Sequence, residues 1–469
     1  MFILSFCIQS DLSHWKNRDV AVLGLGISNI PLVKFLKRHG ANIVACDQKD
    51  ADSLGERYLK LKELDVSFSL GRNYLSILKE QRFDYVFRSP GLRPDLNEIE
   101  IARNNGARIT SEIELVFEMA PCDIIGITGS DGKTTTTTMT ALMIEKSGMI
   151  VHIGGNIGKP LINEVETYLP EDKIVLELSS FQLIHMDRSP RYSLITNLSP
   201  NHLDYHKDYK EYVDSKFNIF LNQDHSDCII INEDDTESKI ILEKAKSNVL
   251  SFSMNKQVDF GAYLDNESLY LKDEKGLHLI CHVNEVKLLG RHNIENILAA
   301  ATLASSAGAD INSIRYVAKT FAGVPHRLEF IREVEGVKYF NDSIASSPTR
   351  AIAALKSFDN NIVLIAGGSD KYISFDELGD YIVKKAKSLI LLGQTSDKIR
   401  ESVTKAMVKN NKQIEVIQTI SLEEAVFAAK RVAKAGDNVL LSPACASFDM
   451  FNNFEQRGMM FKELVNNLK

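Results

Sequence analysis

The sequence predicts an α/β protein of three domains, each built on a mainly parallel β-sheet. Three observations support this prediction. The chain has 469 residues, which is enough for about three domains of ordinary size. Short runs rich in aliphatic and β-branched residues alternate with stretches of helical periodicity. Many of these runs end in glycine or polar residues, as strands of an open sheet do beside a ligand.

The first domain is expected to span residues 1–111 and to be Rossmann-like. Residues 20–47 predict a strand, a Gly-x-Gly turn, an amphipathic helix and a second strand that ends at Asp47. The glycine pattern of a dinucleotide site is incomplete, because Asn29 stands where the third glycine belongs. The segment therefore predicts a nucleotide-type fold without indicating NAD.

The second domain, residues 112–322, carries a phosphate-binding loop. Residues 126–138 read GITGSDGKTTTTT, between an apolar β-rich run and a helical stretch. A helix start attracts anions, glycines let the backbone approach them, Lys133 neutralises charge and Thr134 reaches a bound Mg²⁺. Ile127 stands where the usual G-x-x-x-x-G-K-[ST] spacing needs glycine, so the spacing leaves the lineage open. A loop that merely caps a helix is disfavoured by Gly-Lys-Thr after a strand.

Two further strands of this P-loop ATPase-type domain end in candidate ligands. Glu177 ends the apolar run of IVLELSSFQL, and His202 follows that of LITNLSPNHLDYH. Ligands of open α/β sheets lie beyond the carboxyl ends of the strands, so both side chains are expected to approach the phosphate loop. A carboxylate suits Mg²⁺, whereas a histidine in this position is equally well explained as a hydrogen-bonded turn residue.

The third domain, residues 323–469, is also expected to be Rossmann-like. It contains NIVLIAGGSDK, SLILLGQTSDKI and NVLLSPACASFDMF, and each predicts an apolar strand followed by a polar turn and a helix. The strand ends of this domain supply Gly367, Gly368, Lys371, Ser442 and Ser447.

Composition excludes several classes of function. A net charge of −7 argues against a general nucleic-acid or anionic-membrane surface. The six cysteines are scattered without a C-x-x-C pair, which indicates reduced thiols in a cytoplasmic protein. No run is long enough to span a bilayer, and the apolar opening MFILSFCIQ lacks a basic leader, so neither a membrane span nor a signal peptide is expected.

Eight motifs occur in an order that matches a known family. They are T-G-x-x-G-K-T, GGNIG, ELSSFQL, NHLDYH, GRHNIENILAA, PHRLE, NDS and LSPACASFDMFNNFEQRG. Together they resemble the Mur ligases from about Val20 onward, and the last motif favours the branch that adds D-glutamate. The resemblance identifies the loop as an ATP site in which T-G-x-x-G-K-T replaces the longer spacing.

The resemblance implies an ATP-dependent ligase of peptidoglycan synthesis, and hence of cell-wall biogenesis, cell shape and cell division. The implied partners are ATP, Mg²⁺, UDP-N-acetylmuramoyl-L-alanine and D-glutamate. The substrate carboxylate attacks the γ-phosphate of ATP to give an acyl phosphate, which the amine of D-glutamate then attacks. Such chemistry depends mainly on positioning and charge neutralisation. A cytoplasmic monomer is expected, with no nucleic-acid partner and no membrane insertion.

The resemblance also assigns residues to ATP, metal and catalysis. The implied catalytic residues are Lys133, His202 and Lys216. The implied metal ligands are Thr134, Glu177, His202 and Lys216. The family lysine matching Lys216 is carbamylated by CO₂, which turns a cation into a carboxylate, whereas the sequence alone predicts an exposed helix lysine. The implied ATP contacts are Gly129, Ser130, Asp131, Gly132, Lys133, Thr134, Thr135, Asn296, Arg327 and Asp342.

Two of these assignments depend on local sequence. Asn293 and Asn296 lie three residues apart, hence on one helix face, and the resemblance gives Asn296 to the adenine. The family normally reads N-D-S-K-A-T where this chain has NDSIAS at 341–346. Ile344 thus replaces a family lysine, and no role is carried to it. Lys371 is the candidate to supply that charge instead.

The resemblance further implies two sets of substrate contacts. For D-glutamate they are Lys371, Ser447 and Phe454, with the lysine paired to the side-chain carboxylate. A core aromatic is the commoner interpretation of a residue such as Phe454. For the UDP-linked substrate they are Gly26, Ser28, Asp47, Ser89, Gly91 and Asn156, with the Gly24–Gly26 turn facing the diphosphate.

Other classes fit less well. A P-loop protein that uses nucleotide only as a switch or motor needs no third domain carrying Lys371 and Ser447. A folylpolyglutamate synthetase shares the loop type, but is not expected to have a UDP-type first domain. The D-N-P-R motif of the diamino-acid-adding Mur ligases is absent, which disfavours that branch.

Overall fold

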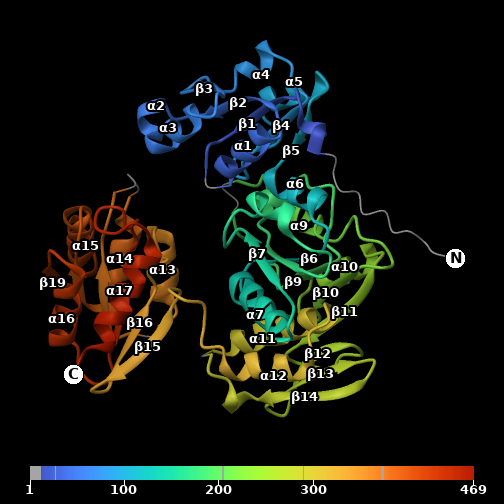
Figure 1. The fold of residues 1–469 in the computed structure, drawn as a ribbon. Coiled ribbons are helices and arrows are strands. Elements are labelled where there is room, and N and C mark those ends of the chain that lie inside the picture. The colour runs from blue at the N-terminus through green and yellow to red at the C-terminus, as the bar shows by residue number, and fades with distance from the viewer. Residues whose placement is uncertain (1–11, 27, 203–204, 289, 359, 371–373) are drawn as a thin grey trace. The chain divides into compact units, whose positions relative to one another are not determined.

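The computed structural model describes residues 12–26, 28–202, 205–288, 290–358, 360–370 and 374–469. The chain forms two compact units, which meet in sequence between Phe321 and Ala322. The first unit holds two β-sheets and the second holds one, so three sheet domains are present (Figure 1). The α/β class and the three-domain organisation predicted from the sequence are therefore confirmed, while the exact limit at residues 111/112 stays a prediction.

The first domain is a five-stranded parallel sheet in the order β3-β2-β1-β4-β5. Its strands are β1 (Asp19–Leu23), β2 (Asn42–Asp47), β3 (Ser67–Leu70), β4 (Tyr85–Arg88) and β5 (Arg108–Thr110). The helical segments up to the second sheet are η1 (Leu12–Trp15), α1 (Asn29–Arg38), α2 (Ala51–Leu54), α3 (Glu56–Lys62), α4 (Ile77–Glu80), α5 (Asn97–Asn104) and α6 (Glu112–Met119). The carboxyl ends of β1 and β4 meet where the strand order reverses, which is the usual ligand position in such sheets.

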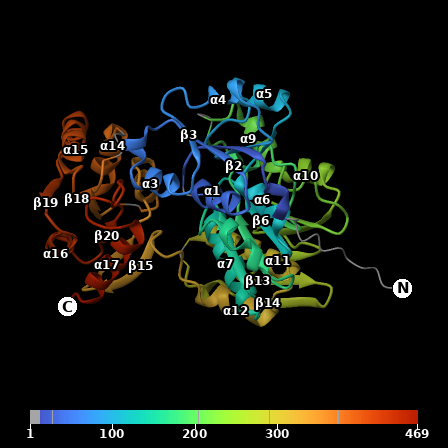
Figure 2. The same cartoon turned by 45° about the horizontal axis from the view of Figure 1, so that its top comes forward.

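The second domain is a nine-stranded sheet in the order β14-β13-β12-β11-β10-β9-β6-β8-β7. Its strands are β6 (Asp123–Thr128), β7 (Val151–Gly155), β8 (Lys173–Glu177), β9 (Tyr192–Ile195), β10 (Cys228–Asn232), β11 (Asn248–Ser253), β12 (Gly261–Asp265), β13 (Ser268–Asp273) and β14 (Gly276–His282). Its helical segments are α7 (Lys133–Lys146), η2 (Leu161–Asn163), η3 (Val165–Thr167), α8 (Ser180–Leu183), α9 (Tyr209–Phe217), α10 (Ser238–Lys244), η4 (Val283–Glu285), α11 (Arg291–Ser306) and α12 (Ile311–Thr320). Helices α7 and α11 pack side by side (Figure 1, Figure 2).

One part of this sheet differs from the predicted parallel arrangement. Strands β12, β13 and β14 run antiparallel. Asn266 and Glu267 join β12 to β13 with φ angles of 46° and 60°. Two residues with positive φ form the tight turn whose twist matches that of a hairpin, so the chain reverses here instead of crossing over through a helix.

The second unit is a six-stranded sheet in the order β15-β16-β20-β17-β18-β19, in which only the pair β15–β16 is antiparallel among the described strands. Its strands are β15 (Glu329–Val334), β16 (Val337–Asn341), β17 (Ile362–Ala366), β18 (Ala386–Leu391), β19 (Glu415–Gln418) and β20 (Asn438–Leu441). Its helices are α13 (Pro348–Lys356), α14 (Asp376–Lys385), α15 (Ser396–Asn410), α16 (Leu422–Val432) and α17 (Phe454–Asn466).

The hydrophobic cores follow the two units. One continuous cluster of buried apolar residues runs from the first sheet to the second and includes side chains of α6 and η2. In the second unit, alternate residues of β17 enter two separate clusters, one on each face of the sheet. No helix within the described ranges is long and apolar enough to cross a membrane.

Candidate active site

The loop between β6 and α7 needs its glycines for both conformation and space. Gly129 has a φ of 145° and Gly132 a φ of 78°, and L side chains rarely adopt such angles. A Cβ atom on Gly129 would overlap the hydroxyl of Thr196, and one on Gly132 would overlap the side-chain oxygen of Asn296. The predicted strand, glycine turn and helix are confirmed, with α7 beginning at Lys133 itself.

Two lysine amines converge on one carbonyl oxygen of this loop. The Nζ atom of Lys133 donates to the carbonyls of Gly129 and Ser130 at 2.8 Å each. The Nζ atom of Lys216 donates to the same Gly129 carbonyl at 2.8 Å and to Oγ1 of Thr128 at 3.2 Å. The loop carbonyls thus gather two lysine amines where a phosphate is expected.

Lys216 is buried, so the exposed helix lysine expected from the sequence alone is wrong. Only 2% of its surface is exposed. Burial, and then the nearby charge of Lys133, lower the pKa of Lys216 well below its usual value, although Glu177 and Asp131 oppose the shift. The environment therefore favours a neutral amine.

Tyr212 connects these groups and was missed by the sequence analysis. Its hydroxyl lies 2.8 Å from Oγ of Ser130, and the amine of Lys216 lies 4.8 Å from the centre of its ring. The ring of His202 lies 6.5 Å from it, centre to centre. Tyr212 and Lys216 are four residues apart on α9 and share one helix face, which is the sequence signal that was available.

Glu177 offers a carboxylate oxygen without a partner. Its Oε1 atom accepts a hydrogen bond of 2.7 Å from the side-chain amide of Asn156, while Oε2 is buried and has no hydrogen-bond partner. An unpaired buried carboxylate oxygen is costly unless a cation or donor approaches it. The structure therefore brings Asn156 to Glu177, and leaves one oxygen of Glu177 suited to Mg²⁺.

His202 lies on an exposed turn with a φ of 54°. Its backbone N–H donates to Oδ1 of Asn201 at 2.9 Å, and its ring packs against Phe181 at 4.9 Å between centres. Phe181 belongs to α8, which directly follows the strand that ends at Glu177. Among the described residues, no group of three or more His, Cys, Asp and Glu side chains is arranged to hold a metal ion.

Helix α11 packs against the phosphate loop and the first turns of α7 through Asn296. Asn296 is buried, donates to Oδ1 of Asn293 at 3.0 Å and accepts from Oγ1 of Thr136 at 3.4 Å. The shared helix face predicted for the two asparagines is confirmed. Asp131 is exposed at the loop tip, where its carbonyl accepts from Oγ1 of Thr196 at 2.7 Å, and Thr135 is half-buried in the first turn of α7.

In the first domain, three predicted residues meet at the switch point. Gly24 has a φ of 85°, and a Cβ atom there would lie 2.6 Å from Oγ of Ser89. Asp47 holds the same turn, because Oδ2 accepts from the N–H of Leu25 at 2.7 Å and Oδ1 from that of Lys49 at 2.9 Å. The turn after β1, the end of β2 and the turn after β4 therefore form one edge.

Asn29 explains the incomplete glycine pattern. Its side-chain amide donates to the carbonyls of Leu23 and Gly24 at 3.1 and 2.9 Å and ties the start of α1 to the turn. The buried Asn29 thus stabilises the turn at the position of the missing glycine. Gly26 and Gly91 are exposed with open space around them, and Ser28 is half-buried at the start of α1.

In the second unit, Asp342 is held by protein groups. Its Oδ2 atom accepts from Oγ of Ser442 at 2.8 Å and Oδ1 from the N–H of Leu328 at 3.2 Å. Burial raises the pKa of Asp342 to about 7, although the nearby guanidinium groups of Arg327 and Arg350 oppose the shift. Arg350 also donates to the carbonyl of Ile344 at 3.3 Å, so a cation lies beside the position where the family lysine is replaced.

Arg457 connects the loop after β16 to the loop after β20, and the sequence analysis did not name it. It is almost fully buried and donates to the carbonyls of Ser343 and Cys445 at 2.9 and 3.1 Å. Burial lowers the pKa of Arg457 to about 10. Ser447 is buried, and the carbonyl of Phe454 accepts from Oγ of Ser343 at 2.8 Å.

Comparison with known proteins decides the family. Three family models match in order: "Mur ligase MurD-like, N-terminal domain" over residues 18–111, "Mur ligase middle domain" over 127–304, and "Mur ligase, glutamate ligase domain" over 326–445. The chain belongs to the Mur ligase family. Curated relatives named UDP-N-acetylmuramoylalanine–D-glutamate ligase are 48% identical in Clostridium novyi, over 97% of each chain, and 48% identical in Clostridium tetani, over 98% of this chain and all of the other.

Solved Mur ligase structures share the fold at low sequence identity. A UDP-N-acetylmuramate-alanine ligase from Thermotoga maritima aligns with a TM-score of 0.53 and 18% identity, over 97% of this chain and 100% of the other. A pseudomurein peptide ligase type C from Methanothermus fervidus aligns with a TM-score of 0.51 and 20% identity, over the same shares. As a Mur ligase, the chain is expected to use ATP and Mg²⁺.

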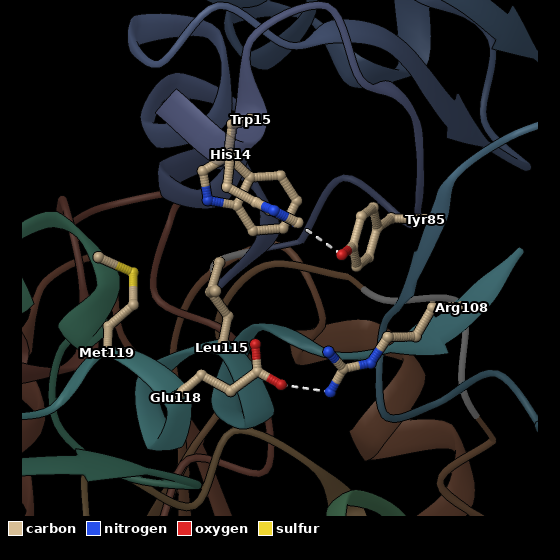
Figure 3. A pocket seen from close by; sticks show the side chains of 7 residues that line it. All are labelled: His14, Trp15, Tyr85, Arg108, Leu115, Glu118 and Met119. Atoms are coloured by element: carbon tan, nitrogen blue, oxygen red, sulfur yellow. Dashed lines mark hydrogen bonds and ion pairs between the residues drawn. The ribbon is translucent and has the colours of Figure 1, made fainter. Parts of the chain in front are cut away.

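One cavity of this Mur ligase lies apart from the strand ends described above. It has a volume of about 270 Å³ and is lined by His14, Trp15, Tyr85, Arg108, Leu115, Glu118 and Met119 (Figure 3). Tyr85 and Arg108 begin their strands, so the cavity borders the amino edge of the first sheet. Its polar groups already pair, His14 with Tyr85 at 2.7 Å and Arg108 with Glu118.

The predicted D-glutamate contact Lys371 lies outside the described residues. Ser447 and Phe454 are described, but their contacts to an amino acid stay predictions for this Mur ligase. The same holds for the ATP contacts of Arg327 and Asp342. The structure brings the predicted residues Lys133 and Lys216 together at the phosphate loop, whereas the sequence analysis did not name the buried Tyr212 and Arg457.

Proposed function

We propose that this Mur ligase joins D-glutamate to UDP-N-acetylmuramoyl-L-alanine with hydrolysis of ATP to ADP and phosphate, as a step of peptidoglycan synthesis. The observation that carries the proposal is the 48% identity to curated ligases of that name over nearly the whole chain. Because the proposed substrates are ATP and a UDP-linked precursor, we also propose that the enzyme acts in the cytoplasm.

ATP is proposed to bind at the start of α7. The amides of the Gly129–Gly132 loop and the positive end of the helix suit its phosphates. The amine of Lys133 exchanges the carbonyl oxygens of Gly129 and Ser130 for phosphate oxygens, which are charged acceptors and bind it more strongly. Thr135, Asp131 and the buried Asn296 complete the proposed nucleotide contacts, together with Arg327 and Asp342.

Mg²⁺ is proposed to be held by Thr134 and Glu177 at the phosphates, with His202 and modified Lys216 for a second ion. The unpartnered Oε2 atom of Glu177 supports this proposal. Because Mg²⁺ keeps several waters and phosphate oxygens as ligands, one or two protein ligands are sufficient for each ion. When bound, the metal neutralises charge that develops on the transferred phosphoryl group.

Lys216 is proposed to carry a carbamate. Its neutral amine attacks the carbon of CO₂ and loses one proton, which leaves an N-carboxylate anion. The lowered pKa of Lys216 favours the neutral form that this addition needs. The carbamate would give the side chain of Lys216 a negative charge in place of a positive one, and it would lie beside the ammonium group of Lys133.

The substrate carboxylate is proposed to attack the γ-phosphorus of ATP, with ADP as the leaving group. The amine of D-glutamate then attacks the acyl carbon, inorganic phosphate leaves and the nitrogen gives up a proton. Gly26, Ser28, Asp47, Ser89, Gly91 and Asn156 are the proposed contacts of the UDP-linked substrate. Lys371, Ser447 and Phe454 are those of D-glutamate.

An amino-acid panel tests the function. Phosphate release with ATP and UDP-N-acetylmuramoyl-L-alanine is expected to require D-glutamate, with L-glutamate nearly inert. Lys133→Ala serves as the control for background hydrolysis. Equal rates with L-alanine or meso-diaminopimelate would refute the assignment. ATP hydrolysis that needs no amino acid would favour a nucleotide switch instead.

A further inference from the structure

Two arginines, one at the end of β4 and one in the segment after it, bind groups of the second domain. Arg88 is buried and donates to the carbonyl of Leu92 and to that of Phe181, each at 3.1 Å. It therefore shapes the turn that contains Ser89 and Gly91, and attaches this turn to α8. The turn and the helix are far apart in sequence but belong to one unit with a continuous core.

Arg93 makes a second and more polar connection. Its Nη2 and Nη1 atoms donate to the two carboxylate oxygens of Glu211 at 2.9 and 3.0 Å, and Nη1 also donates to the carbonyl of Tyr205 at 2.6 Å. A separate hydrogen bond runs from the second domain to the first, because the Tyr205 hydroxyl donates to the carbonyl of Pro90 at 3.2 Å. Asp95, two residues further along the chain, also holds the guanidinium, because its Oδ1 atom accepts from Nε of Arg93 at 2.8 Å.

The anchored segment leads directly to His202. The carbonyl of His202 accepts from the backbone N–H groups of Tyr205 and His206 at 3.1 and 3.0 Å. The ring of Phe181, whose carbonyl Arg88 binds, lies 4.9 Å from that of His202 and 4.3 Å from that of Tyr205. Arg88 and Arg93 therefore both donate hydrogen bonds to residues that contact His202.

The simplest explanation of the Arg93–Glu211 contact is an ordinary surface ion pair, and such pairs contribute little to stability. Two features argue for more. The Arg93–Glu211 pair is bidentate, about three quarters buried on each side, and part of a network. The hydrogen bond from Arg93 lowers the pKa of Glu211 to about 2, so the pair stays charged at every working pH.

We propose that Arg93 is a positioning residue that couples the Ser89–Gly91 turn to the loop carrying His202. Binding of the UDP-linked substrate at that turn then steadies the imidazole of His202. This inference depends on the proposed function, in which the turn holds the UDP-linked substrate and His202 serves the metal.

Hydrogen–deuterium exchange tests the coupling without catalysis. Addition of UDP-N-acetylmuramoyl-L-alanine alone is expected to slow exchange in peptides covering residues 205–211 of the wild type. Arg93→Ala should abolish this response while calorimetry still detects substrate binding. Arg38→Ala is the matched control, because the Arg38–Glu166 ion pair also joins α1 of the first domain to η3 of the second but touches neither loop. An unchanged response in Arg93→Ala would overturn the proposal.

Steady-state kinetics give a second readout. Arg93→Ala is expected to raise the Mg²⁺ concentration for half-maximal rate and to lower kcat by about 10-fold to 100-fold, the effect of a misplaced catalytic group. The KM for D-glutamate should stay unchanged, and Arg93→Lys should be intermediate. If Arg93→Ala melts at a clearly lower temperature than the wild type, Glu211→Gln replaces it in both experiments. A wild type without ligase activity would refute the proposed function, whereas an active wild type with unaltered Mg²⁺ dependence in the variant would refute only the coupling.

Discussion

At the residue scale, the Gly129 carbonyl is the centre of the phosphate loop. It accepts from two lysines, one at the loop and one on α9. Two ammonium groups at hydrogen-bond distance from one atom repel each other, and the repulsion is strongest where water is excluded. Lys216, the more buried of the two, is therefore the one whose neutral amine is favoured, and the proposed carbamate would give this side chain a negative charge.

Lys216→Ala should lower turnover by about 100-fold or more, the usual cost of losing a charged group that stabilises the transition state. ATP should still bind, because Lys133 and the loop amides remain. Acetate or formate should restore part of the phosphate release by occupying the vacated position. Removal of CO₂ at mildly acidic pH should inactivate the wild type.

The control for this variant is Lys210→Ala, on the same helix. Lys210 forms a surface ion pair with Asp214 and contacts none of the loop residues described above. Its activity should match the wild type with and without acetate. Full turnover in Lys216→Ala, or an unmodified lysine in the mass spectrum of the active complex, would contradict the carbamate.

At the element scale, α7 is a helix built from poor helix formers. Thr136, Thr137 and Thr140 are completely buried, and β-branched residues lower helix propensity. The helix forms because it packs against the sheet and α11, and because Gly132 starts it with a left-handed backbone. The apolar spacing predicted the helix, but could not predict that Asn296 of α11 would lie against Gly132 just before its first residue.

Gly132→Ala should weaken ATP binding by about 10-fold or more, since a strained backbone alone costs about 1 to 3 kcal/mol. Two costs act together here, the positive φ and the overlap with Asn296. Gly148→Ala separates them, because Gly148 has a φ of 90° just after the same helix but open space around it. Calorimetric ATP titration and thermal melting of both variants measure the two effects. Equal ATP affinity in Gly132→Ala and the wild type would disprove this account of the loop.

At the scale of the whole molecule, the first unit joins two sheets through α6. Glu112 begins this helix, is buried and has a carboxylate oxygen without a hydrogen-bond partner. Burial raises the pKa of Glu112 from 4.5 to about 7. The folded protein therefore binds this proton more tightly than the unfolded chain does. Its contribution to stability is complete below pH 4.5, declines between pH 4.5 and 7, and is lost above 7.

Glu112→Gln should remove this dependence, because glutamine stays neutral. Relative to the variant, the wild type should lose about 3 kcal/mol of unfolding free energy between pH 4.5 and 8. Urea denaturation at several pH values measures the difference. Glu118→Gln removes the same charge from the same helix at a partly exposed position and is the control. Parallel pH profiles for Glu112→Gln and the wild type would contradict the prediction.

The local sequence predicts most of the strands and helices, but few of the contacts between segments that are distant in sequence. The strand, turn and helix units follow from periodicity and glycine positions. Glu177 and His202 were expected near the phosphate loop because they follow strand ends, whereas Lys216 of α9 was assigned only by the family resemblance. The pairing of Arg93 with Glu211, and the burial of Arg457 between two loops, depend on segments more than a hundred residues apart. Nothing in a single segment indicates such partners, because ordinary surface arginines occur in similar local sequences.

Among the described residues, the two apolar clusters on the faces of the second unit's sheet lie entirely within its own chain segment. A polypeptide that starts at Ala322 thus has what it needs to fold by itself. The proposed D-glutamate contacts of this unit are consequently separable at the level of the gene. Such a fragment is small enough for NMR screening, so ligands that compete with D-glutamate at these proposed contacts can be sought without ATP, Mg²⁺ or the UDP-linked substrate in the tube.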